Sequence, residues 1–213
     1  MEDRITPCVY LEMTDLPAED YAKERALELR KSPGAERVTW WENCVPERQD
    51  LPRRLPEFHT LGLVEGDLTF LPSPTPDGVT GHLFHLTPRP GQGILNDRPT
   101  LGLELVLISP KNAANAQDLR DWGDFVHLRD IAAASPPHFT MITPYANAGA
   151  ETPRFMHLYE LDTDDPEPAF KEMTPATVRH QKSVGGHTWD EWAGHPELVI
   201  EYVNTFRLLG EYR

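Results

Sequence analysis

Several common kinds of site are excluded by what the sequence lacks. Its 213 residues include only two cysteines, Cys8 and Cys44, too few for a disulfide scaffold or a thiolate zinc site, so we expect isolated thiols. No apolar run approaches the roughly 20 residues that a membrane-spanning helix needs. The first residues, Met1 to Arg4, lack the basic and apolar regions of a signal peptide. These absences predict a cytoplasmic protein with no membrane partner.

Basic residues are scarce as well. Lys and Arg number 20 against 34 Asp and Glu, which gives a formal net charge of −14. Neutralising phosphates needs a clustered basic face that this composition does not supply, so we expect no nucleic-acid partner. Ten basic and sixteen acidic residues up to Asn96 give −6, and ten and eighteen after it give −8, so the acidity is evenly spread. The sequence also has no Gly-x-Gly-x-x-Gly motif, phosphate-binding loop or Gly-x-Ser-x-Gly motif.

Proline, by contrast, is abundant, with 21 residues. Its densest stretch covers residues 71–93, where we predict two loops around a short strand, with Gly91 to Gly93 as a turn. We place a boundary between two halves at residues 95–97. The predicted domains are therefore residues 1–96 and residues 97–213, which together can bury a sizeable core.

The two halves have the same order of predicted elements. In the first half, Asp15 as cap and Pro17 in the first turn favour a helix start after the opening strand. The predicted strands cover residues 8–13, 37–41, 58–65, 79–86, 101–108, 139–143, 154–161 and 198–208. The predicted helices cover residues 15–30, 115–132 and 166–180, the last interrupted by Pro175. Landmarks such as Phe58 and Phe155 recur 97 positions apart, which favours a degenerate tandem repeat.

Two segments of the second half carry a family resemblance. Residues 118–130 read DLRDWGDFVHLRD, and residues 153–161 read PRFMHLYEL. Both are similar to motifs of the dimeric α+β barrel superfamily, particularly its EthD-like and stress-responsive branches. Strand, helix, strand, strand, helix, strand is the order of a ferredoxin-like unit. The resemblance implies an α+β fold in which two ferredoxin-like halves form an internal pseudo-dimeric barrel, either as a monomer or as a homodimer.

The halves differ where reactive side chains stand. At the offset of 97, Thr60 and Gly62 in the first half correspond to His157 and Tyr159 in the second. The first helix also places Glu28 where the second half has His127. Because a fused pair can lose one cavity and keep the other, we expect any site to lie in the second half.

His157 and Tyr159 are the first two candidate catalytic residues. They lie two apart on a predicted strand and so point to the same face, where imidazole and phenol can exchange protons with one ligand. His127, the third candidate, rests on the resemblance. On an ideal helix the apolar stripe is Leu119, Trp122, Phe125 and Val126, and His127 reaches a cavity only if the helix ends or bends near Leu128. The alternative is that all three are structural residues with satisfied polar tips.

Four further residues are candidates for substrate binding: Glu104, Trp122, Arg154 and Tyr202. Glu104 interrupts an apolar strand, so its carboxylate must either face a polar cavity or take a partner such as Arg154, Arg207 or His157. In the first half, Trp40 and Trp41 with Tyr10 form a possible stacking surface for a flat ligand, although adjacent tryptophans on a strand usually split between core and surface.

No metal site is expected, because His82 and His85 project to opposite faces of a strand and no clustered ligand motif is present. The resemblance implies a cofactor-independent enzyme that acts on a small hydrophobic or aromatic molecule by proton transfer, as a cyclase, isomerase, decarboxylase or monooxygenase. Two alternatives stay open. One is a ligand-binding or structural module without turnover, and the other is a haem-binding protein, since some members of the superfamily bind haem through one histidine.

Overall fold

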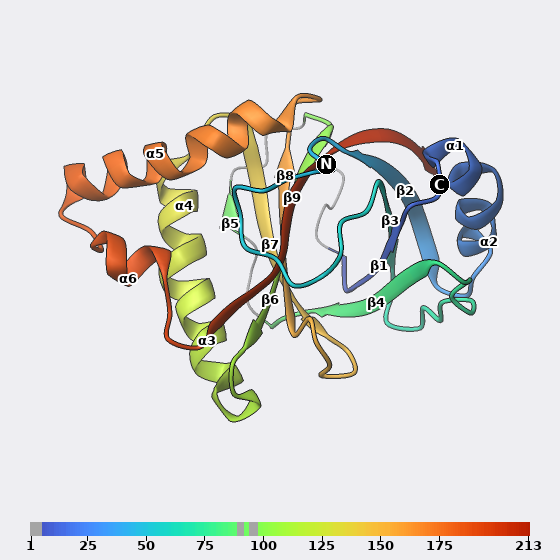
Figure 1. Cartoon of the computed structure of the whole chain (residues 1–213), viewed down its shortest axis with the longest axis horizontal. Helices are drawn as coiled ribbons and strands as arrows, with labels where there is room; N and C mark the ends of the chain where they lie inside the picture. Colours follow the sequence, from blue (N-terminus) through green and yellow to red (C-terminus); the bar gives the residue numbers. More distant parts are fainter. Residues whose placement is uncertain (1–5, 89–91, 94–97) are drawn as a thin grey trace.

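The computed structural model describes residues 6–88, 92–93 and 98–213 (Figure 1). The predicted boundary at residues 95–97 and the first four residues lie outside the described residues, as does Gly91 of the predicted turn. All eight predicted strands are present, several of them longer than predicted. The strands are β1 (Cys8–Thr14), β2 (Ala35–Asn43), β3 (Thr60–Gly66), β4 (Val79–Leu86), β5 (Gln92–Gly93), β6 (Gly102–Pro110), β7 (Phe139–Asn147), β8 (Phe155–Leu161) and β9 (Leu198–Tyr212).

Eight of these strands close into an antiparallel barrel. The hydrogen-bonded order is β4-β1-β3-β2-β9-β6-β8-β7, and β7 pairs with β4 to close the ring. The short β5 pairs with Met141 and Ile142 of β7, so Gln92 and Gly93, predicted as part of a turn, form a short strand. Within each set of four strands the order is fourth, first, third, second along the chain, which is the order of a ferredoxin-like sheet. The sets meet at β2–β9 and β4–β7.

The helices lie outside the barrel, in two layers on opposite sides of it (Figure 1). The first half contributes one continuous helix, built from α1 (Ala18–Tyr21), the π-helical segment η1 (Ala22–Ala26) and α2 (Leu27–Arg30). The second half contributes a longer layer. Its helices are the 3-10 turn η2 (Ala113–Asn115), α3 (Ala116–Trp122), the π-helical segment η3 (Gly123–His127), α4 (Leu128–Ala134), α5 (Pro166–Val184) and α6 (Trp189–Ala193).

The alternation of each strand divides its side chains between two cores. One core fills the barrel and is formed by residues such as Leu11, Leu63, Leu105 and Phe206. The other face of each sheet packs against helices, with Tyr21 and Leu29 prominent in the first half and residues of α4, α5 and α6 in the second. The strands are buried on both faces for this reason, which explains why β6 reads as a nearly continuous apolar run.

Three predicted element boundaries are wrong. The first helix begins at Ala18, with Pro17 at its N-cap, and Asp15 contacts His59 instead of capping the helix. The helix α5 continues through Pro175 to Val184. The segment after it, predicted as irregular, contains α6, whose start is fixed by a capping box in which Thr188 and Glu191 exchange hydrogen bonds with each other's backbone.

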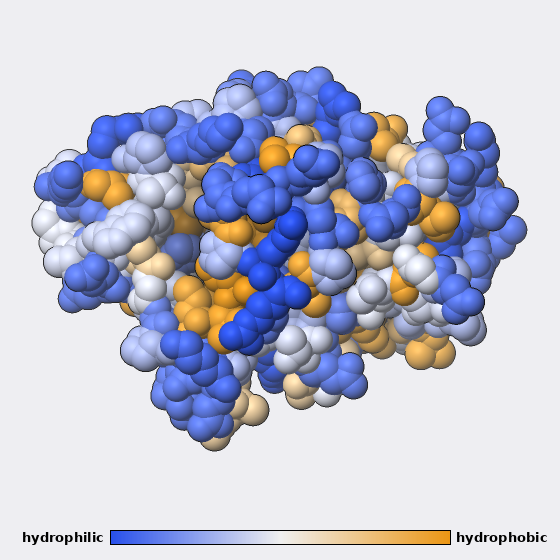
Figure 2. All heavy atoms as spheres, in the orientation of Figure 1, coloured by the Kyte–Doolittle hydropathy of each residue, from blue (hydrophilic) through white to orange (hydrophobic). Residues whose placement is uncertain are grey.

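The face of the molecule in Figure 2 is largely polar. Figure 2 shows mainly hydrophilic residues on the face it presents, with hydrophobic residues gathered near its centre. None of the described helices is long and apolar enough to cross a membrane.

Candidate functional site

Each half carries a buried glutamate on its first strand, facing the helices. In the first half this residue is Glu12, which pairs across the strands with Gly62. Its carboxylate accepts hydrogen bonds from Arg25 (Nη2 to Oε1, 2.5 Å) and from the Tyr21 hydroxyl (2.9 Å), and both partners come from the helix above it. A Cβ on Gly62 would lie 1.8 Å from the Tyr21 hydroxyl oxygen, so glycine provides the space for this phenol. The first-half carboxylate is thus fully engaged by its own helix.

The second-half glutamate, Glu104, lies in a different environment. It pairs with Tyr159 on β8 and with Thr205 on β9, and it is 2% exposed. Its Oε2 atom has no hydrogen-bond partner among the described residues. Burial raises the pKa of the Glu104 carboxyl to about 8, with Arg48 opposing and Glu167 reinforcing this shift. Glu104 is therefore mostly protonated at neutral pH, and none of the partners proposed from the sequence reaches it.

Tyr159 and His157 lie beside Glu104 on the same outward face of the sheet. Both are nearly completely buried, and no hydrogen bond links either polar group to another residue in the described part of the chain. Burial, and secondarily the charge of Glu104, raises the pKa of the Tyr159 phenol well above its usual value. Burial lowers the pKa of His157 to about 3, so its imidazole is neutral at physiological pH. Three neighbouring buried polar groups are thus available to a ligand, which is rare in a protein interior.

The π-helical segment η3 covers these residues. A Cβ on Gly123 would lie 3.4 Å from His157 Cε1, so the segment rests directly on the imidazole. The Asp124 carbonyl accepts a hydrogen bond of 2.7 Å from the side-chain amide of Gln92, which reaches it from β5. The wider π turn also shifts the helix phase, so Phe125 is 55% exposed and Asp124 is buried. The apolar stripe predicted for an ideal helix, which included Phe125, is wrong for this reason.

The same π turn brings His127 into an aromatic stack. Its ring lies between Trp122 and Trp192, with centroid distances of 5.0 and 5.2 Å. His127 Nδ1 lies 3.0 Å from the Trp192 carbonyl oxygen, and Trp192 Nε1 donates to the His127 carbonyl at 3.2 Å. Because a carbonyl can only accept, Nδ1 carries the proton and Nε2 presents a lone pair when the ring is neutral. Burial lowers the pKa of His127, partly offset by the hydrogen bond to Trp192.

The remaining predicted residues are not brought together with Glu104. Trp122 stacks on His127, and its Nε1 donates to the Glu191 carbonyl at 2.8 Å. Arg154 donates to the Asn147 carbonyl at 3.0 Å and lies over the Phe155 ring. Tyr202 points into the barrel core, on the opposite face of its sheet, and bonds with Glu57.

The structure also shows the partners of Arg207 and the positions of Trp40, Trp41 and Glu28, for which the sequence allowed alternatives. Arg207 bonds with Glu42 rather than with Glu104. Trp41 packs in the barrel, while Trp40 packs outside it against Tyr212, so the two tryptophans split between faces. In the first half the π turn ends at Ala26, so Ala26 rather than Glu28 occupies the position of His127.

Two further groups of residues near the site have no local signature in the sequence. Trp192 lies in α6, which was predicted as irregular, and only its stacking on His127 reveals its position. Asp130 accepts hydrogen bonds from His187 Nδ1 (2.8 Å) and Gln181 Nε2 (3.0 Å) at the edge of a surface hollow of about 470 Å³. Gln181 and His187 lie 51 and 57 positions after Asp130 in the chain, so no local spacing in the sequence predicts that these side chains meet.

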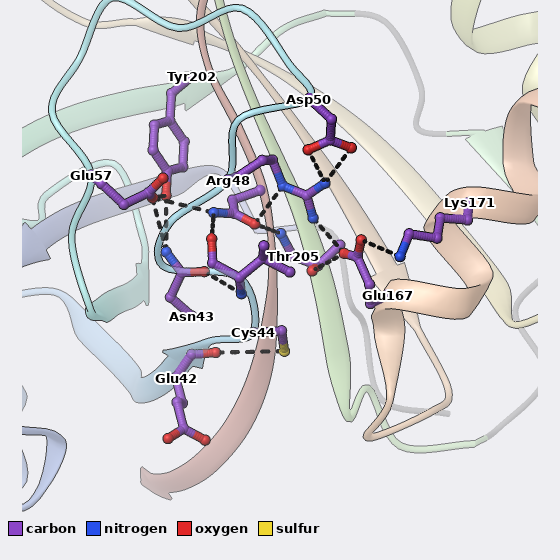
Figure 3. A network of polar contacts seen from close by, with 12 residues as sticks. Glu42, Asn43, Cys44, Arg48, Asp50, Glu57, Glu167, Lys171, Tyr202 and Thr205 are labelled. Atoms are coloured by element: carbon purple, nitrogen blue, oxygen red, sulfur yellow. Dashed lines mark hydrogen bonds and ion pairs between the residues drawn. The ribbon is translucent and has the colours of Figure 1, made fainter.

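A polar network joins the first half to β9 and α5 of the second half (Figure 3). Its centre is Arg48, in the segment of residues 44–59 that joins β2 to β3. Arg48 Nε donates to Asn204 Oδ1 at 2.9 Å, and the guanidinium forms ion pairs with Asp50 and Glu167. The segment thereby fastens to both β9 and the first turn of α5.

One of the two histidines is unsuited to bind haem. A Cβ on Gly123 would be in van der Waals contact with His157, so no space for a porphyrin lies between the π segment and that imidazole. His127 stacks on two indoles and is held at Nδ1 by a carbonyl of α6.

No protein-family model matches the sequence, and no curated protein matches it. Among solved structures, an anthrone oxidase-like protein matches with a TM-score of 0.55 and 11% identity, over 98% of this chain and 94% of that chain. A mutant chlorite dismutase from Candidatus Nitrospira defluvii in complex with cyanide also has a TM-score of 0.55 and 11% identity, over 96% and 92% of the two chains. A protein described as a major regulator of staphylococcal pathogenesis has a TM-score of 0.54 and 8% identity, over 95% and 99%. At these identities the likeness shows the fold, an α+β barrel.

Proposed function

We propose that the chain is a cofactor-independent enzyme that acts on a small hydrophobic or aromatic molecule by proton transfer in its second half. The observation that carries the proposal is the row of Glu104, Tyr159 and His157, three buried polar groups whose polar tips have open hydrogen-bonding capacity within the described part of the chain. Leaving such groups unpaired costs free energy, which a ligand with matching polar atoms would recover. The similarity to an anthrone oxidase-like protein supports a small-molecule substrate.

The proposed roles follow from the protonation state of each group. Glu104 and Tyr159 carry protons at neutral pH and can donate hydrogen bonds to an oxygen that gains negative charge. His127 presents a lone pair at Nε2 and can accept a proton, while Trp192 fixes the tautomer through its carbonyl. His157 is neutral and serves as a hydrogen-bond partner inside the site. The indole of Trp122 stacks on His127 and helps to hold that ring in place.

Anthrone is a suitable test compound because it is planar and aromatic, and it has an acidic methylene group opposite its carbonyl. Its oxidation consumes one dioxygen and yields anthraquinone and water. We expect the purified chain to quench its tryptophan fluorescence on binding anthrone and to accelerate quinone formation above the buffer rate. The variants His127→Asn and Tyr159→Phe should each lower the rate by about 10²-fold, the usual contribution of one proton-transfer or oxyanion-stabilising group.

Tyr21→Phe is the matched control, since Tyr21 is the phenol beside the buried glutamate of the first half and should leave the rate unchanged. Anthrone binding with no acceleration would favour a non-catalytic ligand-binding module. Binding and rates that are unchanged in Tyr159→Phe would contradict the assignment of the site.

We also infer that the two halves, residues 1–96 and 97–213, are the partners of an internal pseudo-dimer. The common strand order, the π turn in each first helix and the glutamate on each first strand support this inference. It predicts a stable monomer in light scattering, because the pairing that other chains obtain by dimerising is supplied within one chain. A homodimer whose dissociation unfolds the protein would contradict it.

A further inference from the structure

Arg48 is a buried cation of the first half that contacts elements of the second half. It lies in the segment of residues 44–59 and is 3% exposed, unlike most arginines, which remain at the surface. Its guanidinium lies over the ring of Phe170 on α5, 4.9 Å from the centroid, and it bonds with Asn204 on β9. The contacts to α5 and β9 hold the charge at one defined place beside the Glu104 end of the site.

Two residues, Thr205 and Glu167, stand between Arg48 and Glu104. Thr205 stands directly opposite Glu104 in the β6–β9 pairing, and its hydroxyl donates to Glu167 Oε2 at 2.8 Å. Glu167 in turn forms the ion pair with Arg48 (Figure 3). Two carboxyl groups, Glu104 and Glu167, are therefore neighbours of one guanidinium, and only Glu167 is paired with it.

The charged and titratable groups around Glu104 come from three elements. They are the phenol of Tyr159 on β8, Glu167 on α5, and Arg48 on the segment from the first half. Lys171 on α5 and Asp50 lie farther out, where they bind Glu167 and Arg48 respectively. Because Glu167 and Asp50 are paired with the guanidinium, its charge only partly offsets the effect of burial on Glu104.

We propose that Arg48 is a positioning residue whose pairing with Glu167 withholds its charge from Glu104, so that Glu104 keeps the proton it donates in the second-half site. The donor role rests on the proposed function, whereas the electrostatic coupling does not. In this arrangement the first half has lost its own open carboxyl and controls that of the second half. Glu167 holds the guanidinium in place, and removing Glu167 releases the charge toward Glu104.

Two variants separate this coupling from a purely structural role. Arg48→Met and Glu167→Gln both break the same ion pair, so a structural contribution would move any property in the same direction in both. The proposal requires opposite effects. Glu167→Gln should lower the midpoint of Glu104 ionisation by about one pH unit, and Arg48→Met should raise it by a similar amount. Arg48→Lys should restore most of the wild-type midpoint.

The midpoint is measured on the full chain by infrared difference spectroscopy of the protonated carboxyl band during a pH titration, with Glu104→Gln as the blank that identifies the band. Arg53→Met, which breaks the neighbouring Arg53–Glu57 pair of the same segment, is the matched control and should leave the midpoint unchanged. If Arg48→Met does not fold, Glu167→Gln decides alone: a lowered midpoint supports the proposal, and an unchanged or raised one overturns it.

Shifts in the same direction in the two variants also overturn the proposal. The titration needs no substrate, so its outcome is independent of the anthrone experiment. Opposite shifts in a chain that neither binds nor oxidises anthrone would uphold the electrostatic coupling and count against the proposed function alone.

Discussion

Both halves have a buried glutamate at the corresponding point of their first strand, but the surroundings of the two carboxyl groups differ. Glu12 has an arginine and a phenol from its own helix, and Ser73 satisfies the arginine further. Glu104 has neither, because its helix has Trp122 and Val126 at the positions that Tyr21 and Arg25 occupy relative to the π turn of the first half. The phenol also changes element: it comes from the helix as Tyr21 in the first half and from β8 as Tyr159 in the second. A fully hydrogen-bonded ion pair in one half thus corresponds, in the other half, to a row of polar groups without hydrogen-bond partners among the described residues.

This difference shows how one sheet can support either stability or a site. A buried ion pair whose hydrogen bonds are all made locks the helix to the strands. A buried carboxyl without such partners keeps its proton and its capacity to donate. The four predictions below test the contrast, starting with the largest expected effect.

Removing the cation of the first half should destabilise the protein most. Arg25→Met leaves Glu12 buried without its ion-pair partner, and we expect a loss of about 3–5 kcal/mol in the free energy of unfolding, measured by urea denaturation. Lys23→Met on the same helix, which affects only an exposed pair with Glu19, should leave the stability nearly unchanged. A loss of stability as small as that of Lys23→Met would mean that Arg25 does not stabilise the buried Glu12 carboxylate.

Removing the carboxyl of the second half should do the opposite. The pKa of Glu104 rises from 4.5 to about 8 in the folded chain, so the folded state holds more protons and stability falls as pH rises through this interval. Glu104→Gln removes this loss and should stabilise the chain by about 4 kcal/mol at pH 8, with little change below pH 4.5.

Urea denaturation across the pH range measures the effect of Glu104→Gln. The control, Glu12→Gln, should destabilise the chain at neutral pH because it breaks a complete ion pair. An unchanged pH slope in Glu104→Gln would show that Glu104 is not held protonated in the folded chain.

The neutral imidazole of the second half should make the chain sensitive to acid. The pKa of His157 falls from 6.5 to about 3, so the unfolded state binds more protons between these values and stability is lost as pH decreases. His157→Phe should retain about 3 kcal/mol more stability at pH 4 than the wild type. The control is His85→Gln, which changes an exposed histidine and should leave the loss of stability at low pH unchanged. An equal change in both variants would exclude His157 as the cause.

The two phenols should give the smallest contrast. Tyr21→Phe removes a buried hydrogen bond to Glu12 and should cost about 1 kcal/mol. Tyr159→Phe removes a hydroxyl that bonds to none of the described residues, so its thermal unfolding should stay close to that of the wild type. A loss of stability in Tyr159→Phe equal to that in Tyr21→Phe would indicate that the Tyr159 hydroxyl is hydrogen-bonded in the folded chain as well.

Much of the architecture could be read from local patterns. The strands from β1 to β9 alternate or run as apolar segments, and the order of elements in each half indicates a ferredoxin-like unit. The π turns could not be predicted, because hydrophobic periodicity assumes 3.6 residues per turn. The condition stated for His127, a bend near Leu128, is met by a change of helix type that begins at Gly123. Its contact with Trp192 joins two segments 65 residues apart and has no local signature.

The sequence by itself determined the α+β class, the acidic surface, the order of the strands along the chain, and the presence of His157 and Tyr159 on one face, because these follow from composition and from the two-residue period of a strand. Tertiary structure alone decided that Glu12 is paired while Glu104 is not, and that Arg48 of the first half lies beside a carboxyl of the second. Charge and hydrogen bonding depend on which groups meet across the barrel and its helices. That is a matter of distance in space, which spacing along the chain does not encode.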